Sequence, residues 1–319
     1  MIVAARRIIE EYALLITSGA VLEVAAYPKP GNVHRLRDYS DIWFEDFLLS
    51  SHVILLNNLK AIKRGLSKNR GKYSIGDLIY DSLTRSMRIH GGGNTCLGIA
   101  LILHPLAFAL GVLLGKGWII TSERIAREVP SVLREYTTPY DTIMFYRAVR
   151  KANPSYIRET DDTGEYPNVW DRRYREKIIK RNINLYDVLS YSSSRDIVAR
   201  EIVGGYRNVL EAKRYLEHLI NNGTPWNLAV VRTFLRLGSM IEDTVVSRTL
   251  GYSKAREVMQ MLSKLSSEIN ERAKLLKELY HVDEYFASKG IRLGAIADLV
   301  SAMISLYAID KKRNIIHGR

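Results

Sequence analysis

The sequence has a single cysteine, Cys96, among its 319 residues. One cysteine excludes a disulfide framework and any zinc site built from cysteines, and it fits a reducing compartment. A secretory signal is also missing, because Arg6 and Arg7 are followed by Glu10 and Glu11, which would interrupt its apolar region. We therefore expect a cytoplasmic protein.

Strand signals are equally scarce. Alternating apolar and polar runs are few, and no Asn-Gly or Asp-Gly turn joins two β-branched segments. Apolar residues instead recur every three to four positions, which is typical of amphipathic helices. This spacing predicts helices over residues 3–26, 43–63, 75–89, 95–114, 122–135, 139–151, 172–182, 196–220, 226–238, 253–280 and 295–310. The predicted fold is all-α, a single multi-helix globular domain over residues 1–319.

Only one long apolar run is present, from Cys96 to Leu114. His104 and Pro105 lie near its middle, which favours a buried core helix broken near Pro105 over a membrane span. We expect no membrane partner. Residues 152–172 are the least helical part, interrupted by several Pro, Gly and Asp residues. This irregular excursion is either a lid over a site or a surface loop.

Acidic residues are in deficit, since 34 Asp and Glu face 47 Lys and Arg, a net charge of +13. Such a balance favours anionic partners, either nucleotides and coenzymes or nucleic acid. The densest cluster, 172–181, is by default a solvated helix face, and neither zinc-finger spacing nor an RNP-like aromatic pattern accompanies it. A basic helical nucleic-acid-binding protein is the alternative that this charge leaves open.

The segment Lys29–Asp38 follows the first predicted helix and begins with a helix-breaking Pro-Gly pair. Backbone amides at Gly31 and Asn32, flanked by cations, either hold phosphate oxygens or form a plain charged connector. The cations concerned are Lys29, His34, Arg35 and Arg37. Asp38 and Asp41 are candidates for binding magnesium or orienting the loop, and Asp41 is alternatively the N-cap of the next helix.

We call short polar segments between apolar helices polar islands, and Lys29–Asp38 is the first of them. The second, Gly91–Gly98, precedes the apolar run. Gly92 and Gly93 allow close backbone approach, and a helix N-terminus directly after Asn94 and Thr95 offers free amides. No Gly-Lys-Ser/Thr follows, so this is not a P-loop. We interpret Cys96 as an apolar filler, because no base accompanies it.

Two further islands each centre on an acid. Asp243 lies at the start of a helix near Ile241, with Arg248 one turn beyond Thr244, and it is either a functional carboxylate or a helix cap. Asp298 follows Gly294 inside an otherwise apolar helix, where an acid needs a cation, a metal or a helix terminus.

These four islands, in this order, resemble the triphosphoribosyl-dephospho-CoA synthase family, in a divergent, archaeal-like branch. The shared motifs are Lys-Pro-Gly-Asn-Val-His-Arg at 29–35, Gly-x-Asn-Thr at 92–95, Asp-Thr-x-x-x-Arg-x-x-Gly at 243–251 and Ala-Asp-Leu at 297–299. This sequence departs from the family motifs at two places, one that bears on the acceptor and one that bears on the turn geometry. Cys96-Leu97 stands where bacterial members have His-Lys, and Arg292-Leu293 replaces a proline before Gly294.

The resemblance implies a transferase that moves the 5-triphosphoribosyl group of ATP to a ribose hydroxyl of 3'-dephospho-CoA and releases adenine. Family members make the prosthetic-group precursor for citrate lyase and malonate decarboxylase. The implied cofactor is Mg²⁺ with ATP, and an enzyme using another acceptor is the nearest alternative. A homodimer is one option for the oligomeric state, which the sequence leaves open.

The motifs also assign residue roles by resemblance. Asp243 and Asp298 are the expected catalytic acids, and Asp38, Asp243 and Asp298 the expected metal ligands. The expected substrate- and phosphate-binding residues are Lys29, Gly31, Asn32, His34, Arg35, Gly92, Gly93, Asn94, Thr95, Arg248 and Gly294.

Overall fold

The computed structural model describes residues 2–67, 71–268, 272–312 and 315–316. These residues form fifteen helices and no strand, and the chain is 71% helical, so the all-α prediction is confirmed. The helices are α1 (Ile2–Ala25), α2 (Phe44–Leu66), α3 (Gly76–His90), α4 (Leu97–Gly115), α5 (Ser122–Tyr136), α6 (Pro139–Ala152), α7 (Tyr174–Lys180), α8 (Leu185–Ser192), α9 (Ile197–Val203), α10 (Arg207–Asn221), α11 (Trp226–Met240), α12 (Thr244–Leu250), α13 (Tyr252–Glu268), α14 (Arg272–Ser288) and α15 (Gly294–Lys311).

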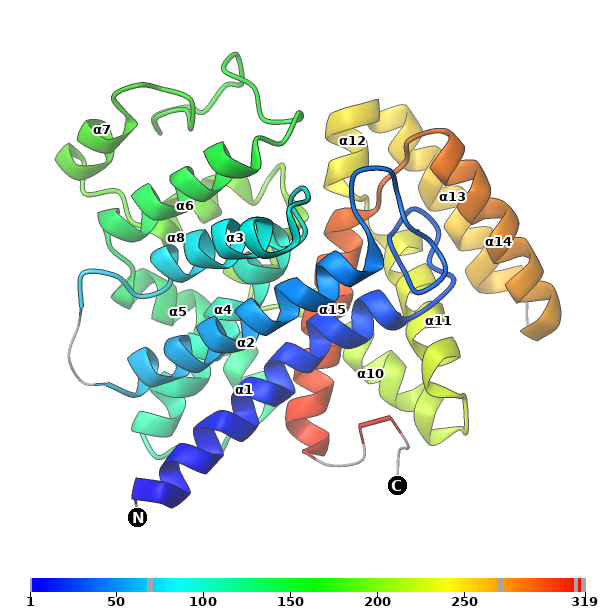
Figure 1. Cartoon of the computed structure of the whole chain (residues 1–319), viewed down its shortest axis with the longest axis horizontal. Coiled ribbons are helices and arrows are strands. Elements are labelled where there is room, and N and C mark those ends of the chain that lie inside the picture. Colours follow the sequence, from blue (N-terminus) through cyan, green and yellow to red (C-terminus); the bar gives the residue numbers. More distant parts are fainter. Residues whose placement is uncertain (1, 68–70, 269–271, 313–314, 317–319) are drawn as a thin grey trace.

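Helices α4 and α15 form the centre of the fold, with α2 packed on α4 and α1 packed on α15 (Figure 1). Two glycines allow this packing to be close. A Cβ on Gly19 would overlap the Ser301 carbonyl of α15, and a Cβ on Gly111 would overlap the Ile62 carbonyl of α2. The main hydrophobic cluster draws residues from every one of these helices except α7.

Helix α4 runs without interruption through Pro105, so the predicted break there is wrong. The Tyr206 hydroxyl donates a hydrogen bond of 2.7 Å to the Ile102 carbonyl, in the turn before the proline. The proline nitrogen cannot donate to the carbonyl four residues earlier, that of Leu101, and the bond from Tyr206 lies on the next carbonyl along the helix. In the described part of the chain, α4 is the one helix long and apolar enough to span a membrane, and 83% of it is buried inside the protein.

Other helix boundaries differ from the sequence prediction. The predicted helix 196–220 is two helices, α9 and α10, separated at 204–206, where Gly205 and Tyr206 adopt positive φ. Helix α8 was not predicted. The predicted helix 253–280 appears as α13 and α14, and its residues 269–271 lie outside the described residues. The N-cap of α2 is Trp43 rather than Asp41, because the Asp46 carboxylate accepts the Trp43 N–H at 2.9 Å.

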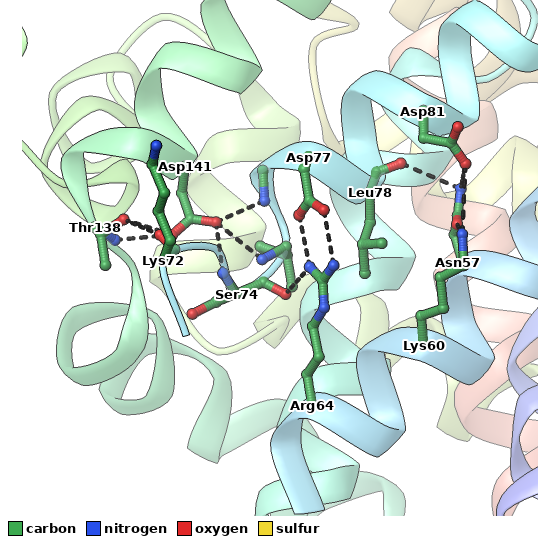
Figure 2. A network of polar contacts seen from close by, with 12 residues as sticks. Asn57, Lys60, Arg64, Lys72, Ser74, Asp77, Leu78, Asp81, Thr138 and Asp141 are labelled. Atoms are coloured by element: carbon green, nitrogen blue, oxygen red, sulfur yellow. Dashed lines mark hydrogen bonds and ion pairs between the residues drawn. The ribbon is translucent and has the colours of Figure 1, made fainter. Parts of the chain in front are cut away.

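A polar network between α2, α3 and α6 fixes where α3 begins (Figure 2). One carboxylate oxygen of Asp141 accepts the backbone N–H groups of Ser74, Ile75 and Gly76 at 2.8–3.0 Å. Arg64 of α2 holds Asp77 through two bonds of 2.6 and 2.7 Å. The network thereby positions α3, and with it the glycine-rich turn that follows α3 and leads into α4.

The irregular segment 153–173 packs on a smaller hydrophobic cluster with α6, α7 and α8. Asn168 secures the segment by donating to the carbonyls of Arg158 and Glu159, at 3.1 and 3.3 Å. Tyr146 of α6 donates to the Pro167 carbonyl at 2.9 Å. The basic cluster 172–181 lies largely on α7, with most of its cations exposed.

Candidate functional site

We call residues 29–38 the opening loop. A cleft of about 610 Å³ opens where the N-termini of α4, α12 and α15 meet this loop and residues 154–157 of the irregular segment. Of the residues predicted for the site, eight line this cleft: Gly31, Asn32, Gly93, Asn94, Thr95, Arg248, Gly294 and Asp298. The cleft thus draws on all four polar islands of the sequence. The predicted residues outside its lining are Lys29, His34, Arg35, Asp38, Gly92 and Asp243.

Lys29 is fully buried and forms an ion pair with Glu23 of α1. Burial lowers the pKa of Lys29 and raises the pKa of Glu23. Glu23 lines the cleft and Lys29 does not. Lys29 therefore lies behind the cleft wall, where it partners this carboxylate.

His34 is also buried and is oriented toward α14, where its Nε2 lies 3.3 Å from Asp283. Its Nδ1 accepts the Leu36 N–H at 3.2 Å, so the proton of the neutral ring is on Nε2 and is donated to Asp283. Burial lowers the pKa of His34. The same acid accepts a 2.9 Å bond from Arg37, so Asp283 anchors the opening loop to α14.

Arg35 and Asp38 lie exposed on the outer side of this loop. The Arg35 guanidinium lies 5.2 Å from the centre of the Tyr27 ring. Asp38 accepts the Phe44 N–H at 2.7 Å, at the start of α2. Asp41 lies at the cleft rim and pairs with Arg292 at 3.0 Å.

The glycine-rich turn is held by its own side chains. The Asn94 carbonyl oxygen accepts the Cys96 and Leu97 N–H groups at 3.2 and 2.9 Å, which caps α4. The Thr95 hydroxyl lies 2.6 Å from the Ser50 hydroxyl and 3.3 Å from His90 Nε2. Gly92 donates its N–H to His90 Nδ1 at 2.9 Å.

Cys96 is 1% exposed, and burial raises the pKa of its thiol to about 11. A thiol that stays protonated is a poor nucleophile. The position therefore fits the apolar filler that the sequence analysis describes.

Asp243 joins the N-termini of two helices. Its Oδ1 accepts the N–H groups of Val245 and Val246 in α12, at 2.8 and 3.2 Å. Its Oδ2 accepts the Ile296 N–H in α15 at 2.9 Å. Burial raises the pKa of Asp243 to about 6 in spite of these bonds. The contacts of Asp243 are thus those of a helix cap, and its carboxylate holds α15 in place relative to α12.

Asp298 lies one turn into α15 and lines the cleft. No hydrogen bond or ion pair to it is found within the described residues. Burial raises the pKa of Asp298 well above its ordinary value, and the nearby acids Glu23, Asp243 and Asp196 raise it further. A carboxylate in such surroundings attracts a cation or donates a hydrogen bond as the neutral acid.

Two arginines line the cleft. Arg248 of α12 donates to the Tyr156 carbonyl at 3.1 Å and lies 3.9 Å from both Asp161 and Asp196. Arg292 stacks 3.5 Å from the centre of the Tyr39 ring. Both guanidinium groups can bind phosphate oxygens of a ligand in the cleft.

Glu23 and Asp196 also line the cleft, although neither was predicted as a site residue. Glu23 carried a signal, since it occupies an apolar-spaced position of the first predicted helix. Asp196 is the N-cap of α9, and it gave no signal beyond that of an ordinary cap.

The fold and the cleft define an all-α protein with a polar cleft, lined by two arginines and by several carboxylates within the described residues. The model of the CitG family, ATP:dephospho-CoA triphosphoribosyl transferase, matches residues 9–316. The chain belongs to this family of transferases, and the sequence resemblance is confirmed.

The solved structures include a protein from Archaeoglobus fulgidus that carries the provisional assignment triphosphoribosyl-dephospho-CoA synthase. It matches with a TM-score of 0.60 and 24% sequence identity, over 83% of this chain and 100% of that one. This likeness shows the fold. No functionally curated protein matches the sequence.

Proposed function

We propose that this protein transfers the triphosphoribosyl group of ATP to a ribose hydroxyl of dephospho-CoA, with the reaction taking place beside Asp298. The observation that carries the proposal is the unpartnered carboxylate of Asp298 in the cleft of a chain that belongs to this transferase family. An acid in an apolar helix is costly unless a partner compensates it, and here a substrate supplies that partner.

The chemistry follows from the bonds exchanged. The bond between the anomeric carbon of the ribose and the adenine nitrogen breaks, and its electron pair leaves with adenine. The acceptor oxygen bonds to the same carbon, and its proton balances the charge on the departing base. The transition state resembles an oxocarbenium ion, which a carboxylate stabilises. Asp298 either accepts the hydroxyl proton or faces the cationic sugar.

Arg248 and Arg292 bind the triphosphate in this proposal, since they are the cations that line the cleft in the described part of the chain.

The other predicted residues have structural roles in this proposal. Lys29 compensates Glu23, while His34 and Asp38 maintain the opening loop. Asn94 and Asp243 hold the N-termini of α4 and α15 in place. These five groups position the cleft rather than touch the reacting atoms.

A divalent cation fits the cleft beside two carboxylates. Glu23 and Asp298 both line it. Lys29 already pairs with Glu23, whereas Asp298 has no cationic partner among the described residues. Among the described residues no three His, Cys, Asp or Glu side chains form a metal cluster. Mg²⁺ commonly takes one or two carboxylates with substrate phosphates and waters, so a larger cluster is unnecessary. Magnesium would supply charge neutralisation of the triphosphate.

The test is incubation with ATP, Mg²⁺ and dephospho-CoA, followed by mass spectrometry for free adenine and a triphosphoribosyl adduct. Parallel reactions with coenzyme A and AMP test the other acceptors that Cys96-Leu97 makes relevant, since both residues line the cleft. Asp298→Asn should lower the rate by about 10²–10⁴-fold. Glu45→Gln, on the exposed start of α2, is the matched control. Salt-sensitive RNA binding without any adenine release would instead favour the nucleic-acid alternative.

We place the enzyme in the cytoplasm on the strength of its one buried, unpaired cysteine. A single domain, with the irregular segment as part of the site, is the organisation that the shared core supports. A homodimer stays a prediction that sedimentation of the purified protein would test.

A further inference from the structure

A second cavity of about 240 Å³ adjoins the cleft and lies between α6, α8, α9 and the irregular segment 153–173. We name it the side chamber. It shares part of its lining with the cleft, so the two spaces meet along a common wall made by Leu101, Phe145, Val149, Ile157, Asp196 and Arg248. The two spaces are therefore direct neighbours.

The irregular segment forms the outer wall of the side chamber. Asp161, Asp162 and Pro167 all contribute to its lining. Arg248 ties the segment to α12 where cleft and chamber meet, through its bond to the Tyr156 carbonyl. The segment is thus part of the chamber wall, and the side chain of Asn168 secures it from within.

The chemistry of the chamber suits a flat heteroaromatic ring. Tyr146, Phe145 and Tyr191 supply aromatic surface, and Val149 and Leu189 supply aliphatic surface. Polar groups occupy part of the same lining, where they can meet the edge of a base: Asp161, Asp162, Thr163, Ser192, Arg195 and Asp196. A nucleobase combines apolar faces with a polar edge in the same way.

We propose that the side chamber binds the adenine ring of a nucleotide whose phosphates lie in the cleft. This inference rests on the proposed function for its ligands, since ATP and dephospho-CoA both carry adenine. Arg248 and Asp196, which line both spaces, then stand beside the ribose. If the ring is that of ATP, the chamber also holds the departing base after transfer.

The test fills the chamber with Ala199→Leu, because Ala199 is 2% exposed and lines it. The matched control is Ala287→Leu, which adds the same volume to a half-buried position on α14, away from both spaces. Binding of free adenine, ATP, dephospho-CoA and inorganic tripolyphosphate is measured by titration calorimetry, with melting temperatures recorded for each variant.

Ala199→Leu should weaken adenine binding about tenfold or more and leave tripolyphosphate binding unchanged. A parallel loss for ATP identifies the base of ATP as the occupant, and a parallel loss for dephospho-CoA identifies that of the acceptor. Wild-type binding of all three adenine compounds by a folded Ala199→Leu protein overturns the proposal.

Tyr191→Ala, at a half-buried chamber position, provides the second variant should Ala199→Leu fail to fold. It removes aromatic surface without adding volume, so it should also weaken adenine binding. Unchanged adenine binding by a folded Tyr191→Ala protein would also overturn the proposal. Adenine binding that depends on the chamber, in a protein that forms no triphosphoribosyl adduct, would separate this inference from the transferase activity.

Discussion

The carboxylate of Asp298 lies directly against the backbone of Gly98, in the space that a Cβ atom on Gly98 would occupy. Gly98 is the second residue of α4, and Asp298 lies on α15. The glycine therefore lets an acid of one central helix approach the N-terminus of the other. That end of a helix carries partial positive charge, which favours a carboxylate beside it.

Gly98→Ala should displace Asp298 and lower transferase activity more than it lowers stability. The added methyl overlaps the carboxylate, a side chain that can rotate into the cleft at the cost of its position. The measurement is kcat/KM together with the melting temperature. Gly111→Ala on the same helix is the contrast, because its methyl would meet the Ile62 backbone and should destabilise the protein instead. Full activity in Gly98→Ala would contradict a role for the position of Asp298.

Asp298→Asn should make the protein more stable than wild type, increasingly so as the pH rises. Because the pKa of Asp298 is raised in the folded state, the folded protein holds this proton more tightly than the unfolded chain. Its favourable contribution is full below the ordinary pKa and is lost as the pH rises toward the folded value. Asparagine removes that dependence. Urea unfolding of both proteins at pH 5 and pH 8 measures the difference between their free energies of unfolding. An equal difference at the two pH values would count against a raised pKa of Asp298.

Helical periodicity was enough to predict much of the fold, because α1, α2, α3, α5 and α6 each bury an apolar stripe. Helices α4 and α15 are instead buried over long consecutive runs of residues. The break between α9 and α10 was not predictable in this way. The Glu201 carboxylate accepts the Val209 N–H at 3.1 Å, so a tertiary contact of a buried acid sets where α10 begins. The uninterrupted course of α4 through Pro105 was not predictable from the sequence either, because a proline inside a helix usually breaks or kinks it.

For the site, the sequence indicated the four segments that meet but not the orientation of their side chains. Asp298 was predictable because an acid in an apolar helix is conspicuous. Lys29 and His34 looked equally available to a phosphate, yet Glu23 and Asp283 bind them. Asp283 lies 249 positions from His34 in the sequence, so only the folded structure shows that this histidine is engaged.

Asp243→Asn should destabilise the protein by about 1–3 kcal/mol, because an amide replaces an acceptor oxygen and leaves buried N–H groups unsatisfied. Those groups belong to α12 and α15, so the cleft should loosen and substrate binding should weaken as well. Chemical denaturation and the KM for ATP measure the two effects. Asp187→Asn, in the capping box of α8, is the control for loss of a helix-capping acid outside the cleft. A stable Asp243→Asn protein that is inactive would instead support a direct catalytic role.

His104 should make the protein lose stability as the pH falls below about 6.5. The buried imidazole lies 2.8 Å from both Ser82 and Asn58, and burial lowers its pKa to about 3. The folded state thus keeps the ring neutral while the unfolded chain takes up a proton, so the contribution present above the ordinary pKa is lost as the pH falls toward 3. The slope for one proton is at most about 1.4 kcal/mol per pH unit.

His104→Gln should flatten the pH dependence of urea unfolding, whereas His218→Gln, at an exposed position of α10, should retain it. Identical slopes for the two variants would show that another group titrates in this range.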